Sequence, residues 1–270
     1  MLKMKKASKQ ELILESIIQA YLKSKAPIGS SELQMKMTLG LSPSTIRIYF
    51  KKLSDEGSLE QLHVSSGRVP TLSALRGYWE EKLDVTHPVK LKSIDTLKHV
   101  THSHQLFCIV EPSTDLLFKE ILVVDKRFLI LVFDKHEVVL QYNNKVEHFL
   151  QRFIGCTMQE LKDIAAQVGL YELHDKLLAL FSHASLLREG DKVIYSIAHE
   201  LQNDALIRTF QMLHFVKSIE NGLYFDGFVP RGCMAIKQKA QLLDEESTVD
   251  LFCFGRIESD FETFFNQVKE

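Results

Sequence analysis

The sequence contains few of the residues that interrupt regular structure. Its 270 residues include only 6 prolines and 12 glycines, so long low-complexity segments are not expected. No apolar run approaches the roughly 18 residues needed to cross a bilayer. The longest run, residues 128–133, has the length of a strand. Hydrophobic residues make up 45% of the chain and charged residues 25%, which suits a protein of two globular domains and excludes extended disorder.

Cysteines and catalytic motifs are also sparse. The sequence has no P-loop and no GxSxG, HExxH or GxGxxG motif, so neither an enzyme nor a cofactor is predicted. The Lys-rich N-terminus has no apolar signal-peptide core, and we expect a cytoplasmic protein with reduced thiols. The four cysteines form no CxxC pair and are Cys108, Cys156, Cys233 and Cys253.

Four potential metal ligands fall close together, at His99, His102, His104 and Cys108. Imidazole and thiolate groups bind zinc or nickel, but this spacing matches no structural-site pattern. We favour exposed histidines in a linker and a buried cysteine on a strand, and therefore predict no metal.

Charge is distributed unevenly along the chain, whose net charge is -2. Residues 1–77 contain 12 Lys and Arg against 6 Asp and Glu, whereas residues 78–270 contain 21 against 29. A basic N-terminal part joined to an acidic remainder indicates an anionic partner for the first part. Ordinary surface variation is the alternative.

Residues suited to capping helices recur along the first 83 positions. They predict helices that begin after Ser8, Ser31 and Ser42, then a hairpin within 58–70 and a fourth helix after Thr71. Three helices followed by a β-hairpin describe a winged helix, in which the second and third helices form a helix-turn-helix.

Several segments of this region resemble the heat-inducible transcription repressor family HrcA, most clearly over residues 10–83. The segments are Pro27-Ile28-Gly29-Ser30, Leu41-Ser42-Pro43-Ser44-Thr45-Ile46-Arg47, Leu59-Glu60-Gln61-Leu62-His63 and Ser66-Gly67-Arg68-Val69-Pro70-Thr71. The sequence departs from the family at Ile48 and Tyr49, where Asn and Asp are usual.

The resemblance implies an α+β protein with a winged helix-turn-helix domain at residues 1–83 and a linker at 84–95. A GAF-like α+β domain follows at 96–270, with a dimerisation insert near 172–205. The resemblance also implies a repressor of chaperone genes that binds an inverted-repeat operator of the CIRCE type on double-stranded DNA as a homodimer. A GroEL-type chaperonin is the implied modulating partner.

The sequence pattern of the C-terminal part predicts short apolar strands followed by helices. We expect one antiparallel sheet from residues 105–110, 116–124, 128–133, 137–142 and 146–152, completed by 223–229, 234–238 and 249–254. Helices are predicted from Thr157 to Gly169, over 172–188 and over 203–220, and the last two are expected to form the dimer interface.

The predicted DNA contacts lie on the third helix and on the hairpin. They are Ser42, Ser44, Thr45, Arg47, Ile48, Lys51, Lys52, His63, Ser66 and Arg68. Arg47 can bind guanine O6 and N7 in a bidentate contact, and Arg68 can reach a phosphate or the minor groove. A phosphate clamp or an intradomain salt bridge remains the alternative for Arg47, and a carboxylate pair the alternative for Arg68.

Other functions remain open from sequence alone. The main alternative is a ligand-sensing winged-helix regulator that holds a small molecule in the GAF-like domain. An enzyme with an accessory winged helix and an RNA-binding protein are the remaining alternatives.

Overall fold

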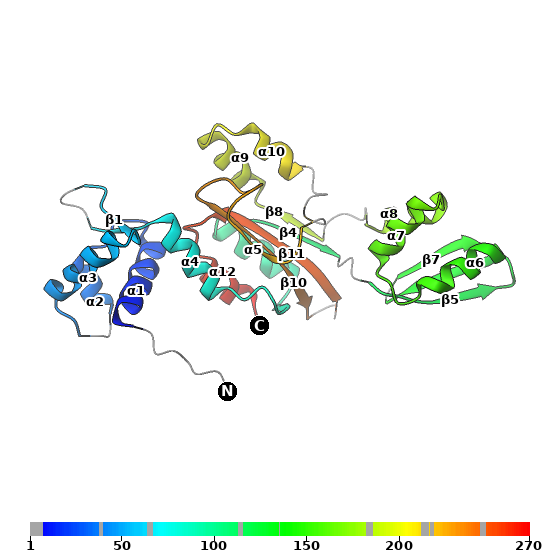
Figure 1. Cartoon of the computed structure of the whole chain (residues 1–270), viewed down its shortest axis with the longest axis horizontal. Helices are drawn as coiled ribbons and strands as arrows, with labels where there is room; N and C mark the ends of the chain where they lie inside the picture. The colour runs from blue at the N-terminus through cyan, green and yellow to red at the C-terminus, as the bar shows by residue number, and fades with distance from the viewer. Residues whose placement is uncertain are drawn as a thin grey trace.

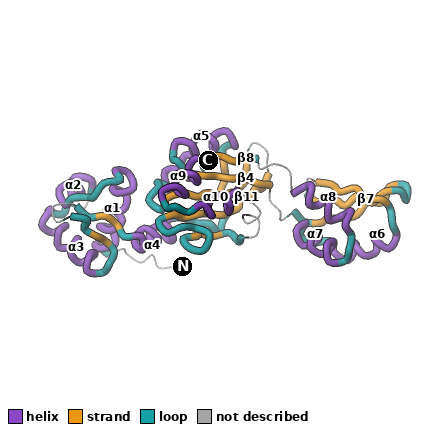
Figure 2. Tube along the Cα trace, turned by 90° about the horizontal axis from the view of Figure 1, so that it is seen from above, coloured by secondary structure: helices purple, strands orange, loops and turns teal. Residues whose placement is uncertain are grey.

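The computed structural model has a mixed α+β architecture in three lobes that lie in a row (Figures 1 and 2). It describes residues 8–37, 40–63, 67–112, 116–134, 136–181, 186–211, 216, 219–243 and 247–270. We refer to residues 8–71 as the N-terminal lobe and to residues 116–181 as the distal lobe. Residues 72–82 connect the N-terminal lobe to the central lobe, which the other described residues form. None of the described helices is long and apolar enough to cross a membrane.

The N-terminal lobe consists of three helices and two short strands. Its elements are α1 (Lys9–Ser24), α2 (Ser30–Lys36), α3 (Pro43–Asp55), β1 (Leu59–Glu60) and β2 (Val69–Pro70), and the two strands pair antiparallel. Ser8 begins α1 through a capping box with Glu11, as predicted. The expected capping box at Ser31 is wrong, because α2 begins two residues earlier than predicted and its N-cap is Gly29. Apolar side chains of all three helices share one core.

Helix α4 (Leu72–Lys82) connects this lobe to the central lobe. Thr71 caps it by accepting the Ala74 N–H, as predicted. Trp79 is fully buried, and its indole N–H donates to the Ile257 carbonyl at 2.7 Å. The buried tryptophan therefore joins α4 to residues almost 180 positions away.

The central lobe is a mixed sheet with helices on both faces. Its strand order is β3-β10-β11-β4-β8, and β9 also pairs with β10. The strands are β3 (Val89–Leu91), β4 (Phe107–Pro112), β8 (Leu187–Glu189), β9 (Gly222–Tyr224), β10 (Cys233–Leu242) and β11 (Ser247–Arg256). The helices are α5 (Ile94–Ser103), α9 (Asp191–Glu200), α10 (Asp204–Gln211) and α12 (Phe261–Val268).

Successive side chains along each strand point to opposite faces of the sheet, and this produces two separate cores in the lobe. In β4, Cys108 and Val110 pack in one core with residues of α4, α5 and α12. Phe107 and Ile109 pack on the other face, with α9 and α10. Such near-continuous apolar strands are typical of a sheet that is covered on both faces.

The distal lobe is a three-stranded antiparallel sheet with helices on one face. It contains β5 (Phe118–Val124), β6 (Phe128–Phe133), β7 (His136–Gln141), α6 (Asn144–Leu150), the 3-10 turn η1 (Gln151–Phe153), α7 (Met158–Gln167) and α8 (Tyr171–Phe181). The predicted capping box of Thr157 and Glu160 is confirmed at the start of α7.

Several sequence predictions for the C-terminal part are wrong. The strand expected at 146–152 is helix α6, because Asn143 caps it and its apolar side chains have helical spacing. The helix expected over 172–188 ends at Phe181, and β8 follows it. The expected single sheet is two sheets, since β4 pairs with β11 and β8 whereas β5–β7 pair only with one another.

The domain boundaries also differ from the prediction. The expected linker 84–95 contains β3, which pairs parallel with β10 and thus belongs to the central sheet. Strands β4 and β8 are antiparallel neighbours, so the chain leaves the central sheet after β4 and returns at β8. The distal lobe at 116–181 occupies this excursion, whereas the insert was expected near 172–205.

Candidate nucleic-acid interface

The start of α3 is held by a cluster of hydroxyl groups. Ser42 accepts the Thr45 N–H at 3.2 Å, and Pro43 occupies the first helical position. The Ser42 hydroxyl lies 2.7 Å from that of Ser44 and 2.9 Å from that of Thr45. The first turn of α3 is therefore preorganised, as Ser42 and Pro43 predicted.

Helix α3 has one buried face and one exposed face. Ile46, Phe50 and Leu53 are buried in the core of the N-terminal lobe. The exposed residues recur at helical spacing and are Ser44, Arg47, Ile48, Lys51, Lys52 and Asp55. Ile48 is 58% exposed on this face. The face thus combines basic groups with one aliphatic side chain.

Arg47 is oriented by the neighbouring helix. Its Nε donates to the Ser30 hydroxyl at 3.2 Å, at the start of α2. The described part of the chain provides no ion pair for Arg47, so its intradomain contact is a hydrogen bond to an uncharged hydroxyl. Ser30 was not predicted as a partner of Arg47, because no local signal pairs two residues 17 positions apart.

The lysines of α3 also lack carboxylate partners among the described residues. The Lys52 ammonium lies 5.6 Å from the centre of the Tyr49 ring. By contrast, Lys36 on α2 pairs with Glu32 at 2.6 Å. The exposed lysines of α3 are consequently available to an anionic partner.

The hairpin residues are less exposed to solvent than predicted. Arg68 is half-buried, and its backbone exchanges two hydrogen bonds with Ile28, at 2.8 and 2.9 Å. A Cβ on Gly67 would lie 2.4 Å from the carbonyl carbon and oxygen of Ile28. Gly67 therefore permits close packing of the hairpin against Ile28 within the lobe. His63 is exposed, and Ser66 lies outside the described residues.

The candidate metal ligands do not converge. His99 and His102 are exposed on α5, whereas His104 Nε2 lies 3.1 Å from the Gln267 side-chain oxygen. Cys108 is fully buried on β4. Across the described ranges, no group of three or more His, Cys, Asp or Glu side chains is placed to hold a metal ion.

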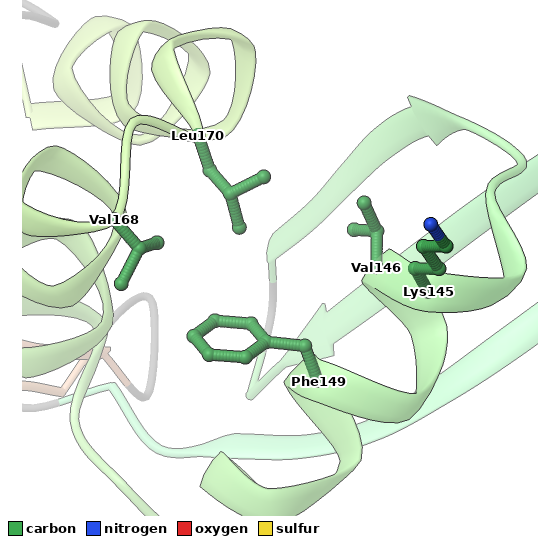
Figure 3. Close-up of a pocket in the computed structure, with 5 residues that line it drawn as sticks. All are labelled: Lys145, Val146, Phe149, Val168 and Leu170. Atoms are coloured by element: carbon green, nitrogen blue, oxygen red, sulfur yellow. The ribbon is translucent and has the colours of Figure 1, made fainter.

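Two of the hollows among the described residues bear on the ligand-sensing alternative. One, of about 220 Å³, lies in the distal lobe between α6 and the α7–α8 turn and is lined by apolar side chains and Lys145 (Figure 3). The other, of about 1020 Å³, lies where α1 meets α5, α9 and the residues before α12. Its lining includes two ion pairs, Arg188 with Asp191 and Arg256 with Glu200.

Comparison with known proteins provides an independent observation. The family model described as the HrcA C-terminal domain matches residues 79–270. Two relatives named heat-inducible transcription repressor HrcA, from Helicobacter pylori strains 26695 and J99, are 29% and 30% identical; each covers 97% of this chain and 95% of the relative. A crystal structure of a hypothetical protein aligns over 97% of both chains, with 18% identity and a TM-score of 0.48.

Proposed function

This chain belongs to the HrcA family, and we propose that it is a transcription repressor of heat-shock genes that binds double-stranded DNA as a homodimer. In this proposal it acts in the cytoplasm and is not an enzyme. The names of its relatives support the repressor role. The exposed basic face of α3 is the observation that carries the DNA-binding role, because its cations have no carboxylate partners among the described residues.

We assign the N-terminal lobe to the winged helix-turn-helix class. Helices α2 and α3 form the helix-turn-helix, and the β1–β2 pair belongs to the wing. In such domains the second helix of the motif lies in the major groove, and its first residues contact base edges. The central lobe is then the GAF-like domain, with the distal lobe inserted into it.

The predicted contacts take distinct roles on α3. Ser44 and Thr45 lie at the helix N-terminus, where hydroxyl groups can contact phosphates or bases. Arg47 extends a guanidinium whose terminal nitrogens can bind guanine O6 and N7, while Ser30 holds its Nε. Ile48 can pack on a thymine methyl group, and Lys51 with Lys52 can neutralise phosphates.

The Arg47→Ala variant tests base reading. A bidentate guanine contact contributes about 1–3 kcal/mol of discrimination, so operator affinity should fall about 5- to 150-fold while affinity for scrambled duplex falls less. Lys52→Ala is the matched control and should weaken both duplexes alike and lower the salt slope. Equal losses of affinity for both duplexes in Arg47→Ala would make Arg47 a contact to the DNA backbone.

Competition by duplex RNA of the same sequence tests the RNA-binding alternative.

We place the dimer interface on the outer face of the distal sheet, in place of the helices expected from sequence. Six apolar side chains gather there, away from the helices that cover the inner face. They are Leu122, Val124, Phe128, Ile130, Val132 and Val139, and four of them are at least 40% exposed. An inverted-repeat operator of the CIRCE type requires two copies related by a two-fold axis, which an isologous interface provides.

Modulation by a GroEL-type chaperonin is supported by the topology of the central sheet. Strand β3 pairs with β10, and β4 pairs with β11, across about 150 residues of chain. Such non-local pairing slows folding and exposes apolar strands for longer. Operator binding by refolded protein should therefore increase when chaperonin and ATP are present during refolding.

A ligand-sensing regulator is the second candidate. The cavity of about 1020 Å³ favours it, because the cavity contacts both α1 and the central lobe. A thermal-shift screen against cytoplasmic metabolites tests this role, since a bound ligand raises the melting temperature.

A further inference from the structure

Two cysteines face each other in the middle of the central sheet. Cys108 on β4 and Cys253 on β11 are directly opposite in the antiparallel register. Their Sγ atoms are 3.0 Å apart, and both residues are fully buried. They point to the face that packs against α4, α5 and α12. The two thiols are 145 residues apart in sequence, so only the fold brings them together.

The geometry of this pair suits a disulfide. Directly opposite residues of antiparallel strands have Cα atoms about 4.5–5.5 Å apart, within the roughly 4.4–6.8 Å that a disulfide requires. The sulfur atoms need to approach each other by about 1 Å to reach the bond length of ~2.05 Å.

The other two cysteines have no such neighbour among the described residues. Cys156 lies in the distal lobe, in another core. Cys233 belongs to the core on the opposite face of the central sheet, and its sulfur accepts a long contact of 4.0 Å from Arg256 Nη1. The chain therefore contains one matched pair and two internal controls.

We propose that Cys108 and Cys253 form a reversible cross-strand disulfide when the protein meets a peroxide. One thiolate attacks the peroxide O–O bond and becomes a sulfenic acid, while the leaving oxygen takes up a proton to form water. The second thiol attacks the sulfenic sulfur, the S–S bond forms, and a second water leaves. In total two thiols lose two electrons and two protons, and one hydrogen peroxide becomes two waters. This modification is independent of the proposed DNA-binding role.

Burial makes this reaction depend on temperature. The thiolate is the reactive form, and burial raises the pKa of the Cys253 thiol. Peroxide reaches the pair when the β4–β11 ladder opens locally. Opening rates rise about 3- to 6-fold per 10 °C for unfolding reactions, so heat and peroxide together promote the disulfide.

Peptide mapping of the full-length wild-type protein tests the proposal. The reduced protein is treated with hydrogen peroxide, its remaining thiols are alkylated, and the unreduced digest is analysed by mass spectrometry. We expect two of the four thiols to disappear, a single linked pair of peptides containing Cys108 and Cys253, and full recovery with dithiothreitol. Links through Cys156 or Cys233, or an intact Cys108–Cys253 dithiol after heating with peroxide, would overturn the proposal.

Two variants and a second temperature sharpen the test. Cys253→Ala should abolish the linked peptides, whereas Cys233→Ala removes an equally buried strand cysteine and should retain them. If Cys253→Ala does not fold, the wild-type map and Cys233→Ala decide the outcome. The rate of thiol loss should rise at least about threefold over 10 °C, and a temperature-independent rate would refute reaction through strand opening.

Discussion

Gly67 makes the tightest backbone approach in the N-terminal lobe, and the Gly67→Ala variant measures it. The added Cβ would lie 2.4 Å from the Ile28 carbonyl, so the β1–β2 pair or the α1–α2 connection has to shift. We expect a loss of about 1–3 kcal/mol in the free energy of unfolding, measured by chemical denaturation.

Gly77→Ala is the matched control for this substitution. Gly77 lies exposed within α4, and a Cβ there would meet no atom within 4 Å. Alanine should stabilise the helix by roughly 0.5–1 kcal/mol. If the two variants were equally stable, the close approach of Gly67 to Ile28 would not exist in solution.

Residues that act locally were predictable from sequence, and residues that act across the fold were not. Ser8, Ser42, Thr71 and Thr157 were identified because a cap depends on the three residues that follow it. The start of α2 was misplaced: Ile28, just before its N-cap Gly29, pairs with Arg68, forty residues away. The Arg47–Ser30 contact was missed for the same reason.

Among secondary-structure elements, α1 and α4 bind the N-terminal lobe to the central lobe. The Tyr21 hydroxyl of α1 donates to the Glu258 carboxylate at 2.7 Å, and Lys25 donates to the Glu258 carbonyl. The Tyr78 hydroxyl of α4 donates to Glu262 at 2.8 Å. These bonds hold α3 at a set position relative to the central sheet through the packing of α1.

The Tyr21 contact predicts how stability depends on pH. Burial, followed by the hydrogen bond and the charge of Glu258, raises the pKa of Tyr21 to about 12. The unfolded chain loses the same proton near pH 10, so this contribution is complete below pH 10 and declines as the pH rises toward 12. The side chain is half-exposed and solvent screens it, so we expect about 1 kcal/mol or less.

Tyr21→Phe isolates this contribution. The variant should be less stable than wild type at neutral pH, and the difference in melting temperature should shrink between pH 10 and 12. A difference that stayed constant over this range would show that Tyr21 acts through packing alone.

The sequence predicted the positions of the strands better than it predicted which strands pair with one another. The runs at 128–133 and 137–142 match β6 and β7 within one residue, because their apolar alternation is local. Their separation from β4 was not predictable, since all these strands have similar apolar patterns and only tertiary packing divides them into two sheets. Helix α5 was missed because it begins within the predicted linker 84–95 and its histidines were interpreted as exposed linker residues.

At the scale of the whole molecule, the distal lobe determines the oligomeric state in our proposal. Val139 lies on β7, is 44% exposed and is paired in register with Ile130 on the outer face. Val139→Lys places a charge in the apolar interface, and we expect a monomer at micromolar concentration by sedimentation or light scattering.

Val168→Lys is the control for this variant. Val168 is 50% exposed at the end of α7, beside the hollow of Figure 3 and away from the outer face of the sheet. The same substitution there should leave the dimer intact. A Val139→Lys protein that dimerises with wild-type affinity would exclude the outer face as the interface.

The return of the chain to a neighbouring strand has a mechanical consequence. The end of β4 and the start of β8 both lead to the distal lobe, and β8 is the edge strand of the central sheet. A force that pulls the distal lobe along the strand direction therefore acts on both strands together and spares the bonds between them. The load passes to the β4–β11 ladder, where Phe107–Pro112 face Val249–Phe254. All the hydrogen bonds of this ladder are then strained in shear at the same time. If two copies of the chain are joined through their distal lobes, a force that pulls the copies apart is therefore resisted by the ladder that contains Cys108 and Cys253.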